Sequence, residues 1–375
     1  MRVGIIGTSW WVETAHLPGL LAEPRAEVVA LCGRNAVRLN ALADAHGVPL
    51  RFADYREMLD RAQLDVVVVS TPNVTHHPMT LAALDAGAHV ICEKPLAMDV
   101  AQAREMLERA EAAGRRHMTF FTWRALPSVA WMQKLIHQGY IGTPYFVNAA
   151  YFSPLAADPD KPAVWRLLKA QAGSGALGDI GAHMIDMLRW CLGEFRQVIG
   201  LMTTRVPRRP ALQAEWSDLF TGTDPVPPSP SRAMTDVDAD DVCAFVGNLV
   251  NGSQVSCQVS FLAHGRDNFQ RLEIYGNEGA LIHELSEIAP LTGRLLGARR
   301  GEQQFNPIPL PPELTAGMDD ERVAMAAKYR RLVGPFFEAI EQGGEFAPSF
   351  VDGLRVQEVI DAVIRSGERP PTDDR

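Results

Sequence analysis

The first third of the chain alternates short apolar runs with amphipathic stretches. The apolar runs cover residues 3–6, 28–31, 66–69, 89–92 and 117–121. Helical periodicity lies between them, after Trp11, from Asn35, at 75–86 and at 99–113. Runs rich in Val and Ile without polar alternation are typical of parallel strands that helices cover on both faces. We therefore predict a doubly wound Rossmann domain over residues 1–123.

From about Arg124 the pattern changes to that of an α+β domain. It predicts a helix at 127–138 and strands at 145–152, 198–203, 242–249, 254–261 and 271–275. Asn251-Gly252 separates two of these strands and favours a tight hairpin turn in which both residues take positive φ. We predict a substrate-binding and oligomerisation domain over residues 124–375 that contains a large, mainly antiparallel open sheet.

Two segments of this second half stand apart. Six prolines between Arg205 and Asp241 exclude a central strand and indicate a long surface excursion. Helices are expected at 320–341 and 351–366, and residues 320–366 could pack back on the first domain. The charged tail 369–375 is expected to fray.

The net charge, the cysteines and the length of the apolar runs bear on which partners and which location we expect. The chain has 375 residues, and 36 Lys and Arg against 45 Asp and Glu give a net charge of −9, which disfavours nucleic acid and anionic membranes. Its five cysteines form no C-x-x-C pair, so we expect reduced thiols and no metal site. No apolar run approaches the ~18 residues that span a bilayer. Since the start also lacks a signal-peptide pattern, we expect a cytoplasmic protein.

A weak phosphate-binding pattern follows the first apolar run. Gly7 fits a glycine position of the dinucleotide fingerprint, while Ser9 and Val12 replace the other two. The helix start would still offer N–H groups to a phosphate. An ordinary strand-to-helix turn is the alternative, and the two tryptophans here either contact the cofactor or pack in the core. The residues of this segment that are predicted to hold the cofactor are Gly7, Thr8, Ser9, Trp10, Trp11 and Val12.

The second apolar run ends without the acid that binds a ribose 2′-hydroxyl. Gly33 stands there, and Arg34 and Arg38 are expected four residues apart on one face of the next helix. Two such charges suit a 2′-phosphate, which favours NADP over NAD. The alternative is a solvated pair of surface arginines.

Polar residues follow two other predicted strands. Thr71-Pro72-Asn73 and His76 come after the 66–69 run, and Glu93 and Lys94 after the 89–92 run. Ligands bind at the carboxyl edge of an open α/β sheet, so Glu93 and Lys94 are predicted to bind the cofactor, with Lys94 beside the nicotinamide or substrate. A lysine there can lower its pKa and handle protons, although a plain surface lysine remains the alternative.

Three polar residues mark an otherwise apolar helix in the second half. Asp179, His183 and Asp186 fall at i, i+4 and i+7, which predicts one stripe. An Asp one turn from a His can orient the imidazole for general-base catalysis. A solvated face is an alternative, whereas a metal site would need ligands that this segment does not offer.

Glu93-Lys94-Pro95 and the Gly178-Asp179-x-Gly-x-His183 pattern together resemble the glucose-fructose oxidoreductase / inositol dehydrogenase / rhizopine-catabolism (Gfo/Idh/MocA) family. The resemblance extends over nearly the whole chain, through Trp165-Arg166 and residues 272–276 to 352–356. It implies an NAD(P)-dependent oxidoreductase acting on a sugar, cyclitol or related polyol.

The resemblance also implies roles for single residues. Lys94 matches the family's E-K-P lysine, Asp179 its motif aspartate, and His183 the histidine that exchanges the substrate hydroxyl proton. Trp165 and Arg166 match a pair near the nicotinamide and substrate. Thr71, Pro72, Asn73 and His76 match a loop that packs on the cofactor. Thr122-Trp123-Arg124 departs from the Asn-Tyr-Arg that members often carry. The predicted substrate contacts are Lys94, Arg124, Tyr151, Arg166, Asp179 and His183.

Three functional hypotheses follow. The leading one is a reversible sugar or polyol dehydrogenase in which the cofactor does the redox chemistry. The second is an enzyme that uses bound NAD(P) within one turnover, for elimination or epimerisation. The third is a non-catalytic NADP-sensing module, against which Lys94, Asp179 and His183 argue. We also expect a homodimer or homotetramer built on the antiparallel sheet.

Overall fold

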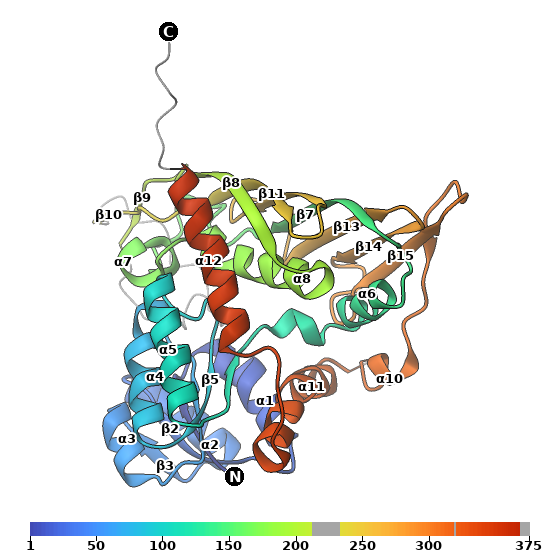
Figure 1. Cartoon of the computed structure of the whole chain (residues 1–375). Coiled ribbons are helices and arrows are strands. Elements are labelled where there is room, and N and C mark those ends of the chain that lie inside the picture. The colour runs from blue at the N-terminus through green and yellow to red at the C-terminus, as the bar shows by residue number, and fades with distance from the viewer. Residues whose placement is uncertain (212–232, 319, 368–375) are drawn as a thin grey trace. The chain divides into compact units, whose positions relative to one another are not determined.

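Figure 1 presents a computed structural model of the chain, in which residues 1–211, 233–318 and 320–367 are described. The chain forms two compact units. Unit 1 contains Met1–Thr122 and a later segment that ends at Gln357. Unit 2 contains Trp123–Ala211, a segment that ends at Ala316, and the residues from Glu358 onward.

Unit 1 is built on a six-stranded parallel sheet with the order β3-β2-β1-β4-β5-β6. Its strands are β1 (Arg2–Ile6), β2 (Glu27–Cys32), β3 (Leu50–Phe52), β4 (Val66–Val69), β5 (His89–Cys92) and β6 (His117–Thr119). All five predicted strands are present, and the predicted Rossmann fold is confirmed. β3 was not predicted because it has three residues, of which only Phe52 is buried.

Four helices of unit 1 begin where a short polar side chain accepts a backbone hydrogen bond. Asn35, Asp54, Asp99 and Asp320 cap α2, α3, α5 and α11 in this way, which satisfies N–H groups that the first turn leaves unpaired. Figure 1 shows α4 and α5 side by side. The helices and short turns are η1 (Val12–His16), α1 (Leu17–Leu21), α2 (Ala36–His46), α3 (Tyr55–Arg61), η2 (Asn73–Thr75), α4 (His76–Asp85), α5 (Val100–Ala112) and α11 (Glu321–Gln342).

The C-terminal part of unit 1 is joined to its N-terminal part by specific bonds. Thr119 Oγ1 donates to Ser349 O over 3.1 Å, and Arg25 Nη2 donates to Gly334 O over 3.0 Å. Phe350 starts α12 (Phe350–Gly367) and belongs to the same apolar core as β4 and β5. Residues separated by more than 200 positions therefore complete one core.

Unit 2 is built on an eight-stranded sheet with the order β16-β15-β14-β13-β7-β12-β11-β8. All pairs are antiparallel except β7 with β12 at the centre, which confirms the predicted α+β class. The strands are β7 (Pro144–Phe152), β8 (Phe195–Thr203), β11 (Val242–Leu249), β12 (Gln254–Ser260), β13 (Phe269–Gly276), β14 (Gly279–Leu285), β15 (Arg294–Arg299) and β16 (Asn306–Pro307).

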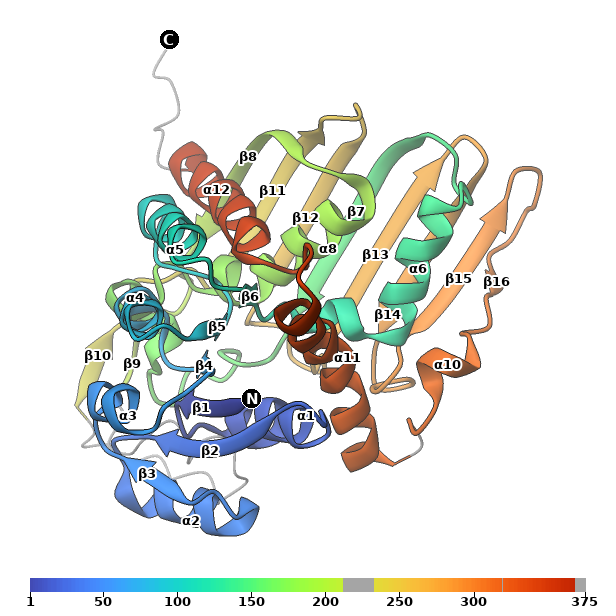
Figure 2. The same ribbon diagram turned by 60° about the horizontal axis from the view of Figure 1, so that its bottom comes forward.

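Helices cover one face of this sheet. α6 packs on β14 and β15, and α8 packs on β7, as Figure 2 shows. On the other face, Ile199, Leu201 and Val246 are exposed, and Val246 pairs directly with Ile199. The helices and turns of unit 2 are α6 (Pro127–His137), η4 (Trp165–Leu167), α7 (Lys169–Ala172), η5 (Leu177–Gly181), α8 (Ala182–Leu192) and α10 (Pro312–Thr315), while η3 (Thr122–Ala125) and α12 cross the boundary between the units.

The structure corrects the predicted turn between β11 and β12. Only Gly252 takes positive φ (+92°), whereas Asn251 does not. The loop is longer than a two-residue turn, since Leu249 N donates to Ser253 O, and such loops need a single left-handed position. Asn251 instead accepts hydrogen bonds from Ser253 through its side chain.

The proline-containing excursion is described only at its two ends. There β9 (Arg208–Pro210) and β10 (Met234–Asp236) form a separate two-stranded ribbon, so these residues are not part of a central strand. The rest of the predicted excursion, residues 212–232, and the predicted tail 369–375 lie outside the described residues.

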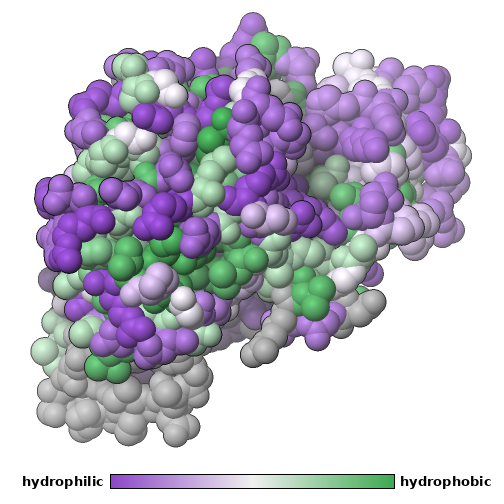
Figure 3. Space-filling view, turned by 90° about the horizontal axis from the view of Figure 1, so that it is seen from below, coloured by the Kyte–Doolittle hydropathy of each residue, from purple (hydrophilic) through white to green (hydrophobic). Residues whose placement is uncertain are grey.

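Three further properties concern the helices, the surface and the cysteines. Within the described ranges, no helix combines the length and apolarity needed to cross a membrane. Figure 3 shows one face of the molecule, on which hydrophilic residues surround a central area of hydrophobic ones. All five cysteines are free and buried, and burial raises the pKa of each thiol.

Candidate functional site

The turn after β1 requires a glycine. Gly7 has φ +130°, and a Cβ there would lie 2.1 Å from Ser70 O on the neighbouring strand end. The chain then enters the π-helical turn η1, where Ser9 O accepts from Val12 N over 3.0 Å. The main-chain N–H groups at a helix start such as this one are where anions bind. The turn therefore fits the pyrophosphate of a dinucleotide.

Gly33 stands at the end of β2, where dinucleotide-binding proteins often carry the acid that binds the ribose, and packing against Thr8 explains why a side chain is absent here. A Cβ on Gly33 would lie 2.5 Å from the Thr8 methyl, so Thr8 occupies the space of a side chain there. Arg38 donates from Nε to Thr8 O (3.0 Å) and from Nη2 to Glu13 Oε2 (2.7 Å). The prediction that both arginines share a helix face is wrong, because Asn35 caps α2 and Arg34 precedes the helix.

His76 joins the loops that follow β4 and β5. Its Nδ1 lies 2.9 Å from Pro95 O and its Nε2 lies 2.9 Å from Thr71 O, and the side chain is fully buried. Burial lowers the pKa of His76 more than the two carbonyl contacts raise it. The predicted cofactor loop at Thr71 and the E-K-P segment are therefore held together by one imidazole.

Glu93 is the most heavily bonded carboxylate of this edge. Its Oε1 accepts from Trp11 Nε1 (2.5 Å) and faces His16 Nε2 (2.8 Å), while Oε2 accepts from Lys94 N (3.1 Å). Burial acts to raise the pKa of Glu93, but the His16 hydrogen bond and the charges of His16 and Lys94 lower it overall. The ring of Trp11 also packs edge-on against Tyr329 at 5.8 Å.

In unit 2, Asp179 and His183 do not lie on one regular helix. Asp179 belongs to the π-helical turn η5 and His183 to α8, which corrects the predicted single stripe. Single π turns occur frequently at functional sites. Asp179 Oδ2 accepts from Arg166 Nε over 3.1 Å, and the Arg166 guanidinium stacks over the Trp165 ring at 4.4 Å.

Two aromatic rings surround His183. The ring centroid of His183 lies 5.9 Å from that of Trp123 and 6.4 Å from that of Tyr151. Tyr151 Oη donates to Asn268 Oδ1 over 3.1 Å. Burial, together with the negative charge of Asp179, raises the pKa of Tyr151, so its hydroxyl keeps its proton at neutral pH. His183, Trp123, Tyr151 and Asp179 thus form one cluster within unit 2.

The carboxylate of Asp186 is buried and binds a side chain outside the His183 cluster. It receives two hydrogen bonds from Arg124, whose guanidinium also lies 5.3 Å from the Trp190 ring. The solvated-face alternative is therefore wrong for Asp186, whose exposed fraction is 1%. Arg124, predicted to contact substrate, has much of its donor capacity bound to this carboxylate.

Asp240 is a supporting residue that sequence reasoning missed. Its carboxylate accepts from Gly175 N (2.6 Å) and Leu177 N (2.8 Å), which fixes the start of η5 and so the position of Asp179. Burial raises the pKa of Asp240 although both hydrogen bonds act to lower it. No local pattern before β11 distinguishes this Asp from the neighbouring Asp238 and Asp241.

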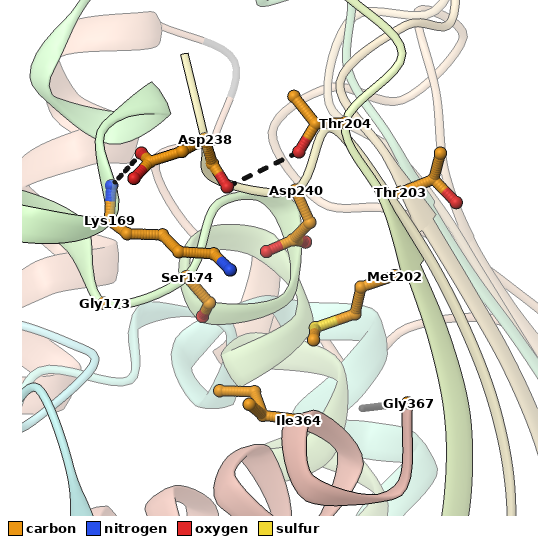
Figure 4. Close-up of a pocket in the computed structure, with 10 residues that line it drawn as sticks. All are labelled: Lys169, Gly173, Ser174, Met202, Thr203, Thr204, Asp238, Asp240, Ile364 and Gly367. Carbon is orange, nitrogen blue, oxygen red and sulfur yellow. Dashed lines mark hydrogen bonds between the residues drawn. The ribbon is translucent and has the colours of Figure 1, made fainter. Parts of the chain in front are cut away.

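Asp240 also borders a cavity of about 320 Å³ in unit 2, shown in Figure 4. In this view Lys169 and Ser174 point toward the same space as Asp240. No predicted site residue lines the cavity, whose walls are Lys169, Gly173, Ser174, Met202, Thr203, Thr204, Asp238, Asp240, Ile364 and Gly367.

Unit 1 therefore carries the phosphate turn, the Thr71 loop and Lys94 at the carboxyl edge of a parallel sheet, and unit 2 carries the His183 cluster. A Rossmann sheet with this edge, followed by an open antiparallel sheet domain, defines a class of dinucleotide-binding oxidoreductases. Residues 1–121 match the family model of the oxidoreductase family with an NAD-binding Rossmann fold, and residues 129–282 match the GFO/IDH/MocA C-terminal domain. The chain belongs to the Gfo/Idh/MocA family of oxidoreductases, which confirms the predicted family.

Individual relatives agree with this assignment. Levoglucosan dehydrogenase of Pseudarthrobacter phenanthrenivorans is 33% identical over 330 residues, covering 84% of this chain and 81% of that protein. Inositol 2-dehydrogenase of Rhizobium meliloti is 25% identical over 375 residues, covering 98% and 96%. The solved structure of a levoglucosan dehydrogenase with NADH and levoglucosan superposes with a TM-score of 0.84 at 29% identity, covering 98% of this chain and 97% of that one.

Proposed function

We propose that this protein is an NAD(P)-dependent dehydrogenase that transfers a hydride between the nicotinamide and a carbinol carbon of a cyclic sugar or polyol. One observation carries the proposal: both halves of the family signature are present, and each is held by a specific bond. The Lys94 main-chain N–H donates to Glu93, and Arg166 donates to Asp179. Relatives named for levoglucosan and inositol support a ring-shaped, polyhydroxylated substrate.

The bound cofactor supplies the hydride acceptor, and the protein manages binding and one proton. Residues 7–12, together with Thr71, Pro72, Asn73 and His76, would hold the dinucleotide. Trp165 and Arg166 would lie near its nicotinamide end. We assign proton uptake to the imidazole of His183, since an imidazole has its ordinary pKa near the working pH. Asp179 orients this ring, and the ammonium of Lys94 polarises the reacting oxygen.

The substrate surface in this proposal is the cluster around His183. Trp123 and Tyr151 offer aromatic area to the C–H face of a sugar ring, and the Tyr151 hydroxyl and Arg166 offer polar contacts. A pocket of apolar walls with a few placed polar groups is typical of small-molecule sites. Arg124 has the weaker claim to a substrate contact because its guanidinium already binds Asp186.

We further propose that the protein binds NADP(H) more tightly than NAD(H). Gly33 offers no carboxylate to a ribose 2′-hydroxyl, and Arg34 is exposed just beyond β2. Against this, Arg38 is partly neutralised by Glu13, and the superposed relative contains NADH. The preference therefore depends chiefly on Arg34.

The exposed face of the unit 2 sheet supports a homodimer or homotetramer. Ile199, Leu201 and Val246 form an apolar area on the adjacent strands β8 and β11, with exposed fractions of 49–72%. Apolar area of this kind is usually covered by a partner surface. The five free cysteines support a reducing compartment, in keeping with the predicted cytoplasmic location.

The proposal is tested with a panel of anhydrosugars, aldoses, cyclitols and ketosugars, each with NAD and with NADP, by following absorbance of the reduced nicotinamide. We expect sustained turnover with at least one cyclic substrate. Cofactor binding without turnover on any of them would contradict the dehydrogenase. Oxidised cofactor that stays bound through purification would instead favour its transient use within one turnover.

A further inference from the structure

A tryptophan of the phosphate turn is bonded directly to the segment that carries the catalytic lysine. Trp11 follows the turn that begins at Gly7, and its indole N–H donates to Glu93 Oε1 over 2.5 Å. Glu93 is the residue before Lys94, and its other oxygen accepts from the Lys94 backbone N–H over 3.1 Å. One carboxylate thus connects the loop after β1 to the loop after β5.

The hydrogen bond between Trp11 and Glu93 belongs to a strong class of hydrogen bonds. An indole N–H is a donor only, and a hydrogen bond to a buried carboxylate is charge-assisted. Glu93 is 6% exposed, so water offers little replacement for a lost donor. His16, one turn further along η1, is the third group on the same carboxylate.

The donor itself is fixed in place by its surroundings. The ring of Trp11 packs edge-on against Tyr329 and lies 5.7 Å from the Trp10 ring. His16 stacks on Phe120 at 4.2 Å, and Phe120 in turn stacks on Tyr329 at 5.9 Å. The indole therefore has little freedom to leave Glu93, and a displacement of the turn is passed on to the carboxylate.

We propose that Trp11 is a positioning residue for Lys94: it fixes the Glu93 carboxylate, and thereby the main chain of Lys94, in register with the phosphate turn. The inference rests on the proposed function, in which Lys94 polarises the reacting oxygen. This role uses the indole N–H of Trp11 and is separate from the cofactor contact proposed for residues 7–12. Occupation of the turn by a dinucleotide then restrains Lys94 through Trp11 and Glu93.

The variant Trp11→Phe removes the N–H and keeps an aromatic ring. We expect kcat to fall by about 10- to 100-fold, the range for slight misplacement of a catalytic group. The cofactor dissociation constant should stay near that of wild type, because phenylalanine keeps an aromatic ring at the turn that is proposed to hold the dinucleotide. Trp131→Phe is the matched control, because Trp131 Nε1 is buried without a hydrogen-bond acceptor among the described residues. Its kcat should equal that of wild type. Unchanged kcat in Trp11→Phe, or equal losses in kcat and cofactor affinity, would overturn the inference.

A second arm uses no substrate. Competitive acylation of lysines followed by mass spectrometry measures the reactivity of the Lys94 amine in the folded, cofactor-loaded protein. We expect Lys94 reactivity to change in Trp11→Phe and in Glu93→Gln but not in Trp131→Phe. The double variant Trp11→Phe/Glu93→Gln should behave as Glu93→Gln alone if both act along one path.

The two arms separate the possible failures. If no sugar is oxidised but Lys94 reactivity responds as described, the proposed function fails and the Trp11 link stands. If Lys94 reactivity is identical in all variants, the link is refuted whatever the activity. Should Trp11→Phe lose its thermal unfolding transition, Glu93→Gln, which preserves side-chain size, decides the outcome.

Discussion

Arg124 and Asp186 form a buried, bidentate ion pair, with Nε 2.9 Å from Oδ2 and Nη2 2.6 Å from Oδ1. The two side chains are 5% and 2% exposed. Removing one partner of such a pair leaves a buried charge, so Arg124→Met should lower the free energy of unfolding by about 3–5 kcal/mol. Urea denaturation of the variant and wild type measures this loss.

The double variant Arg124→Met/Asp186→Leu is the control, because it removes both charges and should recover most of the stability. A single variant within about 1 kcal/mol of wild type would contradict the structural role. If the double variant is stable but has a raised KM for sugar, Arg124 contacts substrate after all.

His183→Ala should lower turnover by roughly 10²- to 10⁴-fold, the usual contribution of general acid–base catalysis. Cofactor binding should persist, because most of the predicted dinucleotide residues belong to unit 1 and His183 is not one of them. Lys94→Ala should slow turnover comparably, and the two losses should not add if the residues act together. Steady-state rates and cofactor titrations of both variants and the double measure this. Near-normal turnover in His183→Ala would show that a group other than His183 takes up the substrate proton.

Glu13 and Arg34 should act in opposite directions on cofactor choice. Arg34→Ala removes the exposed charge and should cost on the order of 1.5–3 kcal/mol of NADP affinity, with NAD affinity nearly unchanged. Glu13→Gln releases Arg38 from a 2.7 Å ion pair and should strengthen NADP binding relative to NAD. Calorimetric titration with both cofactors tests this, and equal losses for NADP and NAD in Arg34→Ala would refute the preference.

Acid should destabilise unit 1 through His117. Burial and the charge of Arg116 lower the pKa of His117 to about 4, and its Nδ1 accepts from Phe350 N over 3.0 Å. Since the unfolded chain binds this proton near pH 6.5, the native state loses at most roughly 3 kcal/mol as the pH falls from 6.5 to 4. His117→Asn, whose amide oxygen can still accept from Phe350 N, should flatten that decline. Denaturant unfolding at several pH values measures it, and parallel curves would exclude this histidine as the cause.

Leu201→Asp tests the apolar area of the unit 2 sheet. A charge at a position that is 72% exposed costs the monomer little, but it would be buried in an interface through β8 and β11. We expect wild type to scatter light as a dimer or tetramer and the variant to have the mass of one chain. A wild-type mass near 41 kDa at micromolar concentration, the mass of one chain, would contradict the predicted interface.

The sequence predicted those features that repeat along the chain. The buried runs Val66–Val69 and His89–Cys92 gave β4 and β5 with their observed bounds, because Val and Ile without polar alternation have few other stable arrangements. Once the strand ends were known, the positions of Thr71 and Lys94 at one sheet edge followed. Other strands were missed: β3 has only three residues, and the longer strands β14 and β15 were not predicted either.

Features that depend on contacts across the chain were not predictable. The π turns η1 and η5 keep a helical composition, so nothing local separated Asp179 from the helix of His183. The partners of the predicted residues also lie far from them in sequence: His16 is 77 positions from Glu93. Identifying such partners requires the fold first.

The interrupted course of unit 1 has a consequence for its synthesis. Its first 122 residues leave the ribosome long before α11 and the start of α12 are made, with most of unit 2 encoded between them. Until then the surfaces that Tyr329 and Phe350 later cover stay open to solvent and to other nascent chains. A gene fragment ending near residue 122 should therefore yield an aggregation-prone polypeptide, and joining residues 320–357 to it by a flexible linker should restore a soluble dinucleotide-binding domain.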